Sequence, residues 1–302
     1  MFERFKTHIL MHLIIFIWGF TGILGVLIKL EALELVWHRL LIGFISLFIG
    51  LLILRRNWRI RGWKLNLATL GVGLLVTTHW VTFYISIQLS TASLGILCLS
   101  TATLHVSWLE PLIRRTPFSW AEFLFGFLVI GGIYIVSQDF SANDYEALAF
   151  GLVSALCAAA FNVFNGKLVK YVNSGAITLY ELGFGLVLLS FVLMYQGNFN
   201  QELFSMTLSD LLWLLFLGII CTSLAFLLTI DIIDKLGSFT VSLSINLEPI
   251  YTMLLAVFIL NEHELLSLRF YLGATIIIGV VIANALYKHF RKIRKAKASP
   301  QP

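Results

Sequence analysis

A glutamate and a proline stand next to each other inside a long apolar run, SINLEPIYTMLLAVFILNE, at Glu248 and Pro249. A charged side chain near the centre of a bilayer costs roughly 2.5 to 3.5 kcal/mol on insertion scales, so it needs a partner, water or a function. Proline donates no N–H to a helix, and we therefore expect a kink there, with Asn246 and Tyr251 beside it. These groups together could bind a proton or an ammonium group. The alternative is a structural glutamate that pairs with a polar group of a neighbouring helix.

An arginine lies inside a second apolar run, at Arg39 next to His38. Arginine does not lose its charge, so it needs a carboxylate from the protein or from a bound molecule. Three interpretations stay open: an anchor for a carboxylate ligand, one side of a gate, or a side chain that reaches the lipid headgroups. Glu181, which is 142 positions later, occupies a comparable place in another apolar run.

Further polar and aromatic residues fall within the apolar runs. Histidines at such a depth can relay protons, and tryptophan rings can receive organic cations on their faces. Each residue also has a simpler explanation, which is a hydrogen bond between helices or packing against core or lipid. These candidates are His79, His105, Thr101, Asn162, Trp18 and Trp80.

Other chemistries find little support in the sequence. His8 and His12 have the spacing of a metal pair, but no third ligand stands near them. The chain has no phosphate loop, nucleophile elbow or zinc motif, so we expect no metal, no cofactor and no enzymatic activity. Its 3 cysteines all fall in apolar runs, which argues against a disulfide framework.

The composition predicts the elements that position these residues. Of the 302 residues, 59% are apolar and 12% are charged, far from the balance of soluble domains. A membrane-spanning helix needs about 20 mostly apolar residues. Ten such segments fit the sequence, so we predict an all-α membrane protein with ten transmembrane helices. They are residues 8–29, 33–54, 66–88, 92–113, 120–137, 147–168, 174–196, 209–230, 238–260 and 268–288.

The distribution of charge predicts the orientation. With the N-terminus placed in the cytoplasm, 18 basic residues fall on the inner side and only Lys29 and Arg269 on the outer side. The positive-inside rule expects this imbalance, so both termini are predicted to be cytoplasmic. The net charge of +5 and the basic C-terminal tail then serve orientation and contact with membrane lipids. We expect no nucleic-acid partner.

A weak internal similarity divides the chain into two halves, residues 1–140 and 141–302. An offset of 147 brings Gly126 onto Gly273 and Gly132 onto Gly279, and it sets Thr101 opposite Glu248. Five spans is an odd number, so related halves would have inverted topology in the membrane. Inverted repeats are common in secondary transporters, which bind substrate near the midplane where the halves meet.

The pairs Trp18-Gly19 and His38-Arg39, together with the stretch INLEPIYTMLLAVFILNE, resemble the EamA-type branch of the drug/metabolite transporter superfamily. The resemblance extends from about Ile9 to Leu286. It implies two inverted five-helix repeats around a central cavity, in a bacterial cytoplasmic membrane. It also implies transport of small organic solutes, often outward and often against protons.

The favoured hypothesis is a secondary active transporter, an exporter, for a small metabolite similar to an amino acid. Arg39 would bind the carboxylate, Glu248 the ammonium or a coupled proton, and aromatic rings the apolar part. One alternative is multidrug efflux of lipophilic cations, with Arg39 as a gate. Another is a membrane-embedded enzyme or a lipid scramblase. The substrate, the coupling ion and the oligomeric state stay open at this point.

Overall fold

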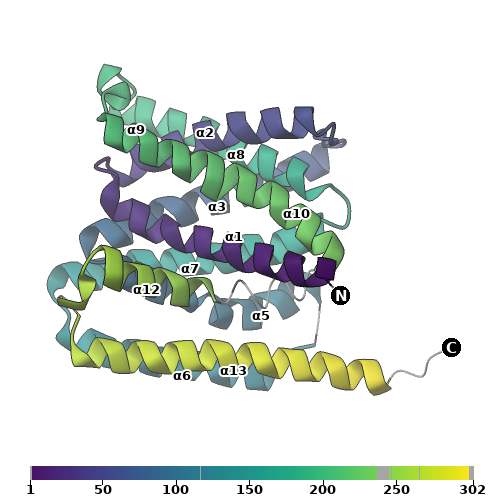
Figure 1. Cartoon of the computed structure of the whole chain (residues 1–302), viewed down its shortest axis with the longest axis vertical. Helices are drawn as coiled ribbons and strands as arrows, with labels where there is room; N and C mark the ends of the chain where they lie inside the picture. Colours follow the sequence, from purple (N-terminus) through teal and green to yellow (C-terminus); the bar gives the residue numbers. More distant parts are fainter. Residues whose placement is uncertain (1, 116, 237–244, 246, 265, 299–302) are drawn as a thin grey trace.

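The computed structural model describes residues 2–115, 117–236, 245, 247–264 and 266–298, and all regular elements in this part of the chain are helices. They run side by side in one bundle (Figure 1). The α-helices are α1 (Phe2–Leu27), α2 (Ala32–Ile53), α3 (Trp63–Leu89), α4 (Ala92–Ser100), α5 (Ala102–Arg114), α6 (Trp120–Val136), α7 (Ala142–Leu168), α8 (Ser174–Gln196), α9 (Leu208–Leu215), α10 (Ala225–Leu236), α12 (Glu248–Ile259) and α13 (Leu268–Ala298). A π-helix, η3 (Phe216–Leu224), joins α9 to α10, and short 3₁₀ turns are η1 (Ser137–Asp139), η2 (Gln201–Phe204) and η4 (Glu262–Glu264).

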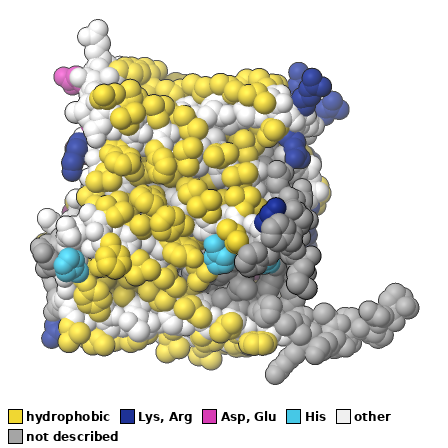
Figure 2. All heavy atoms as spheres, in the orientation of Figure 1, with side chains coloured by type: hydrophobic (Ala, Val, Ile, Leu, Met, Phe, Trp, Pro, Cys, Tyr) yellow, Lys and Arg dark blue, Asp and Glu magenta, His cyan; other side chains and the backbone are white. Residues whose placement is uncertain are grey.

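The helices have the length and composition of membrane spans. Six described segments qualify by themselves, and α4 with α5 makes a seventh if this pair, bent by 41°, is one span. Three shorter apolar helices, Trp120–Val136, Ile250–Ile259 and Leu268–Asn284, overlap the fifth, ninth and tenth predicted spans. On the face in Figure 2, apolar side chains cover the middle and charged ones gather toward the two ends of the bundle. The prediction of an all-helical membrane protein is therefore confirmed.

The two halves of the chain pack in matching pairs. Helix α2 packs against η3, and α8 packs against α3 in the corresponding way. Helix α1 packs along α12, while α7 packs along α4 and α5. Counterpart helices of the two halves also meet, since α2 contacts α8 and α6 contacts α13. The start of α1 and the end of α13 lie at the same end of the bundle (Figure 1).

Small residues allow the closest of these contacts. A Cβ added to Gly273 of α13 would stand 2.5 Å from the backbone oxygen of Gly132 in α6, so the two helices touch through their main chains. A Cβ on Gly73 of α3 would stand 3.0 Å from the backbone oxygen of Glu181 in α8. Without a hydrophobic drive between helices in lipid, such close approach is a main source of their attraction.

Two helices are interrupted near the positions of the candidate residues. The fourth predicted span breaks at Thr101, between α4 and α5. Helix α12 begins at Glu248, so Pro249 stands in its first turn, where the missing N–H has no helical partner to lose. The expected kink also involves the residues before Glu248, most of which lie outside the described part of the chain, so it stays a prediction. Residues 237–244, part of the predicted span 238–260, and Asn246 lie outside the described residues.

Candidate functional site

Arg39 of α2 points into the bundle and is 5% exposed. Its Nε donates to the Thr222 hydroxyl at 3.2 Å, and a terminal nitrogen donates to the Tyr84 hydroxyl at 3.1 Å. The guanidinium lies over the Trp80 ring, 3.8 Å from its centroid. Trp80 and Tyr84 are four residues apart on α3 and so share one helix face. This burial rules out the interpretation of Arg39 as a side chain that reaches the lipid headgroups.

The π-helix η3 is the third element at Arg39, after α2 and α3, and it contributes Thr222. The Thr222 hydroxyl accepts from Arg39 and donates to the Leu217 carbonyl at 2.9 Å, which lies five residues back. Trp18 of α1 donates its indole N–H to the Cys221 carbonyl at 3.1 Å. A π-helix widens the turn and leaves carbonyls in need of other donors, and such segments occur often at functional sites. Trp18 is thereby joined to the surroundings of Arg39.

Glu248 enters from the start of α12. It is partly buried and interacts electrostatically with Arg39, although the two charged groups form no direct ion pair. Helix α12 packs closely against α1 at Gly19. A Cβ added to this glycine would stand only 3.2 Å from the backbone nitrogen of Thr252. The structure thus brings the predicted residues Glu248 and Arg39 into the same region from opposite halves of the chain.

His79 of α3 also interacts electrostatically with Arg39. Its Nδ1 lies 2.8 Å from the Ser154 hydroxyl of α7, and that hydroxyl donates to the His79 carbonyl at 3.1 Å. The ring also packs on Phe83 and Phe161. These contacts fix the ring between α3 and α7, as the packing interpretation of this histidine requires.

Glu181 is buried on α8 and, in the described part of the chain, does not contact Arg39. It is 4% exposed, and its Oε1 has no hydrogen-bond partner. The Asn165 side chain of α7 lies close enough to interact with the carboxyl group. No contact with Arg39 is present among the described residues, so the two internally matched positions do not meet.

Other predicted residues have contacts that do not include Arg39. His38 binds the Glu34 carbonyl through Nδ1 at 2.9 Å, and its Nε2 has no partner. His105 of α5 packs edge-on against Trp108, and its Nδ1 is likewise unpartnered. Tyr251 places its hydroxyl 3.2 Å from His12 Nδ1 of α1.

The two remaining candidates are Thr101 and Asn162. Thr101 donates to the Cys98 carbonyl at 2.6 Å, at the α4–α5 break. Asn162 is exposed on α7.

Sequence reasoning missed two residues of the site, Tyr84 and Thr222. Tyr84 could have been found, because it follows Trp80 by four residues in the predicted helix. Thr222 gave no such signal, because its approach to Arg39 depends on the π-helical turn of η3. A regular helical repeat would direct this side chain differently.

The arrangement can bind an anion. A guanidinium carries five N–H donors in a planar fork that matches a carboxylate. Tyr84 and Thr222 use two of them, and Arg39 has no carboxylate partner among the described residues. The site is closed in this structure, since Arg39 and Trp80 are both buried.

The fold and site define a helical membrane protein of two matched halves with a buried charged centre between them. The family model for the EamA-like transporter family matches twice, over residues 5–138 and 146–285. The chain belongs to the EamA-like transporter family, which makes it a membrane transporter of small molecules.

Comparison with solved structures shows the same fold. A chain described as "Crystal structure of protein" superposes with a TM-score of 0.63 at 16% sequence identity, over 91% of this chain and 96% of its own length. No curated protein matches the sequence. The fold is therefore shared with solved proteins of very different sequence.

Proposed function

We propose that the protein is a secondary active transporter, an exporter, for a small metabolite that carries a carboxylate and an ammonium group, similar to an amino acid. The observation that carries this proposal is the Arg39 guanidinium, which is buried without a carboxylate partner among the described residues. A buried charge without a direct ion pair is costly, and a substrate carboxylate would supply that ion pair.

Glu248 has the complementary role. The electrostatic interaction between Glu248 and Arg39 supports a shared site, in which a substrate bound to Arg39 through its carboxylate would also reach Glu248. The substrate ammonium or a coupled proton would then occupy Glu248, and release of one would favour binding of the other. The two groups belong to different halves of the chain, so relative movement of the halves would change the distance between them.

The membrane arrangement is part of the proposal. Ten spans would form two inverted five-helix repeats, with both termini on the cytoplasmic side of a bacterial inner membrane. The matching helix pairs and the common location of the described ends of α1 and α13 support this topology. The distribution of 18 basic residues to 2 supports the orientation.

Efflux of lipophilic cations is less well supported. The face of Trp80 that could receive such a cation is covered by the Arg39 guanidinium. A positive substrate would therefore approach a buried positive charge, which is repulsive in a region of low dielectric constant.

Counterflow in proteoliposomes tests the proposal. Vesicles loaded with a mixture of amino acids should take up one labelled amino acid but not its methyl ester, which lacks the negative charge. Arg39→Lys should lose at least tenfold in uptake, because lysine cannot form the planar fork. Arg59→Lys, at an exposed position, is the matched control. Equal uptake of acid and ester, or full activity of Arg39→Lys, would refute the carboxylate anchor.

A further inference from the structure

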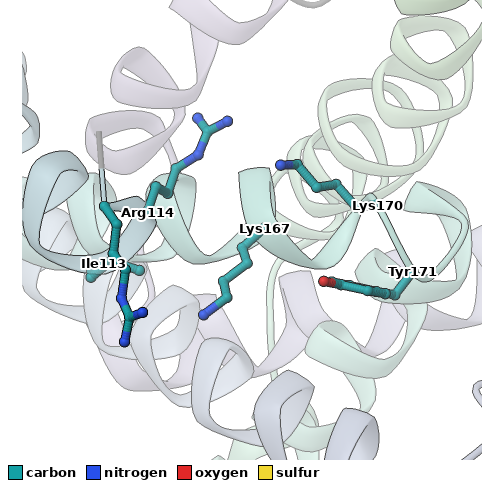
Figure 3. A pocket seen from close by; sticks show the side chains of 6 residues that line it. Ile113, Arg114, Lys167, Lys170 and Tyr171 are labelled. Carbon is teal, nitrogen blue, oxygen red and sulfur yellow. The ribbon is translucent and has the colours of Figure 1, made fainter. Parts of the chain in front are cut away.

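A pocket lined by basic side chains lies between the ends of α5 and α7, apart from the Arg39 site. Its volume is ≈ 350 Å³. Figure 3 shows these side chains around the space where the two helices end. The lining residues are Ile113, Arg114, Arg115, Lys167, Lys170 and Tyr171.

The positive charge of this pocket is only partly balanced. Glu110 accepts from Arg114 at 2.7 Å, one helical turn back on α5. No carboxylate partner of Arg115, Lys167 or Lys170 is present in the described part of the chain. Like charges around one cavity repel each other, so an anion held between them would be favoured. A simple orientation signal requires basic residues on one side of the membrane, but not their convergence on one cavity.

The backbone at the end of α5 contributes to this convergence. Arg115 follows the helix in the left-handed region, with φ 54°. Glycine is the usual residue there, because a Cβ is disfavoured in this conformation. The chain changes direction at this turn, and both Arg114 and Arg115 line the cavity.

Apolar side chains adjoin the basic pocket. Leu112 of α5 is 72% exposed, and Trp108 lies about one turn further back on the same helix, also exposed. Val169, which stands between the lining residues Lys167 and Lys170, is exposed as well. In a membrane protein such exposed apolar residues face the hydrocarbon, so the pocket opens at the boundary between chains and headgroups.

We propose that this pocket binds the phosphate of an anionic phospholipid such as phosphatidylglycerol. The phosphate would lie among Arg115, Lys167 and Lys170, and the acyl chains would follow the exposed apolar residues of α5. Basic pockets at the ends of membrane helices recognise headgroups by this combination of charge and adjacent apolar surface. The lipid would hold the ends of α5 and α7 together, since each helix contributes cations to it. This inference does not depend on the proposed substrate.

Native mass spectrometry of the full-length protein in detergent tests the proposal. Phosphatidylglycerol, phosphatidylcholine and inorganic phosphate are each titrated against the wild type, the double variant Lys167→Gln/Lys170→Gln, and the control Arg59→Gln/Lys64→Gln. The control removes two exposed charges, Arg59 from the α2–α3 connection and Lys64 from the first turn of α3, and so changes the net charge equally. Thermal unfolding in the same detergent shows whether each variant is folded.

The expected result is one tightly bound phosphatidylglycerol and no retained phosphatidylcholine. Each lysine near a membrane surface contributes about 1 kcal/mol to anionic-lipid binding, so the Lys167/Lys170 variant should bind it roughly 30-fold more weakly. The control should remain within about twofold of the wild type.

Equal weakening of lipid binding in both double variants would show that only the total surface charge matters, and it would overturn the proposal. Saturation by inorganic phosphate that displaces the lipid would overturn it in favour of a soluble phosphate ligand. If the double variant does not fold, Arg115→Gln is titrated in its place, and binding at wild-type strength would also refute the site.

Discussion

The carboxylate of Glu262 accepts hydrogen bonds from the backbone N–H groups of Ala92 at 2.8 Å and Ser93 at 3.0 Å, the first two residues of α4. Glu262 is 3% exposed. The first N–H groups of a helix have no partner within the helix, and its positive end attracts a carboxylate. The segment that follows α12 in the second half of the chain is thus attached to the start of α4 in the first half. The internal offset of 147 places Arg115, not an acid, opposite Glu262.

Replacing Glu262 should destabilise the protein. Glu262→Ala leaves two buried N–H groups without acceptors, which costs about 2 to 3 kcal/mol. Glu262→Gln should be milder, since its one carbonyl oxygen can still accept. Thermal unfolding in detergent measures both, with the exposed Glu146→Ala as control. An equal decrease in the control would show that the contact contributes little.

The contact between α6 and α13 gives a second prediction. Gly273→Ala would bring a Cβ to 2.5 Å from the Gly132 backbone oxygen, so the helices must separate and stability should fall by about 1 to 3 kcal/mol. Gly279→Ala on the same helix meets nothing within 4 Å. It should leave stability unchanged or raise it by up to about 1 kcal/mol, because alanine favours helix. Unfolding midpoints that do not differ between the two would contradict this packing.

The hydroxyl groups that hold Arg39 can be removed with little change in shape. Tyr84→Phe should weaken substrate binding several-fold and lower stability by about 1 to 2 kcal/mol, because it leaves a buried charged donor unsatisfied. Thr275→Val is the control, since this hydroxyl binds only its own helix, at the Tyr271 carbonyl, and is exposed. Uptake kinetics and thermal unfolding test the pair. Unchanged kinetics in Tyr84→Phe would mean that Tyr84 does not position Arg39.

Glu248 and Glu181 should behave differently. Glu248 interacts with Arg39, whereas Glu181 has no such contact among the described residues. Glu248→Gln should therefore abolish concentrative uptake or its pH dependence, while Glu181→Gln should retain transport. Uptake with and without an imposed proton gradient separates the two roles. Loss of transport in Glu181→Gln with normal transport in Glu248→Gln would reverse the assignment.

Part of the candidate site could be predicted from the sequence, because some of its residues stand out by their type or by their spacing along one helix. Arg39 and Glu248 were identified as charges within apolar runs, where any charge needs a reason. Tyr84 was within reach as the residue one turn after Trp80. The interaction between Arg39 and Glu248 was expected only from the proposed role of each, since nothing in the spacing of residues 209 positions apart fixes their distance.

The sequence by itself determined that this is a helical membrane protein with related halves, because apolar length and periodic composition are properties of each segment alone. The tertiary structure decided which groups meet. It placed Pro249 in the first turn of α12, and the wide turn of η3 brings Thr222 to Arg39. It also kept Glu181 apart from its internal counterpart Arg39. These outcomes depend on how whole helices pack and where their ends fall, which involves residues far apart in the chain.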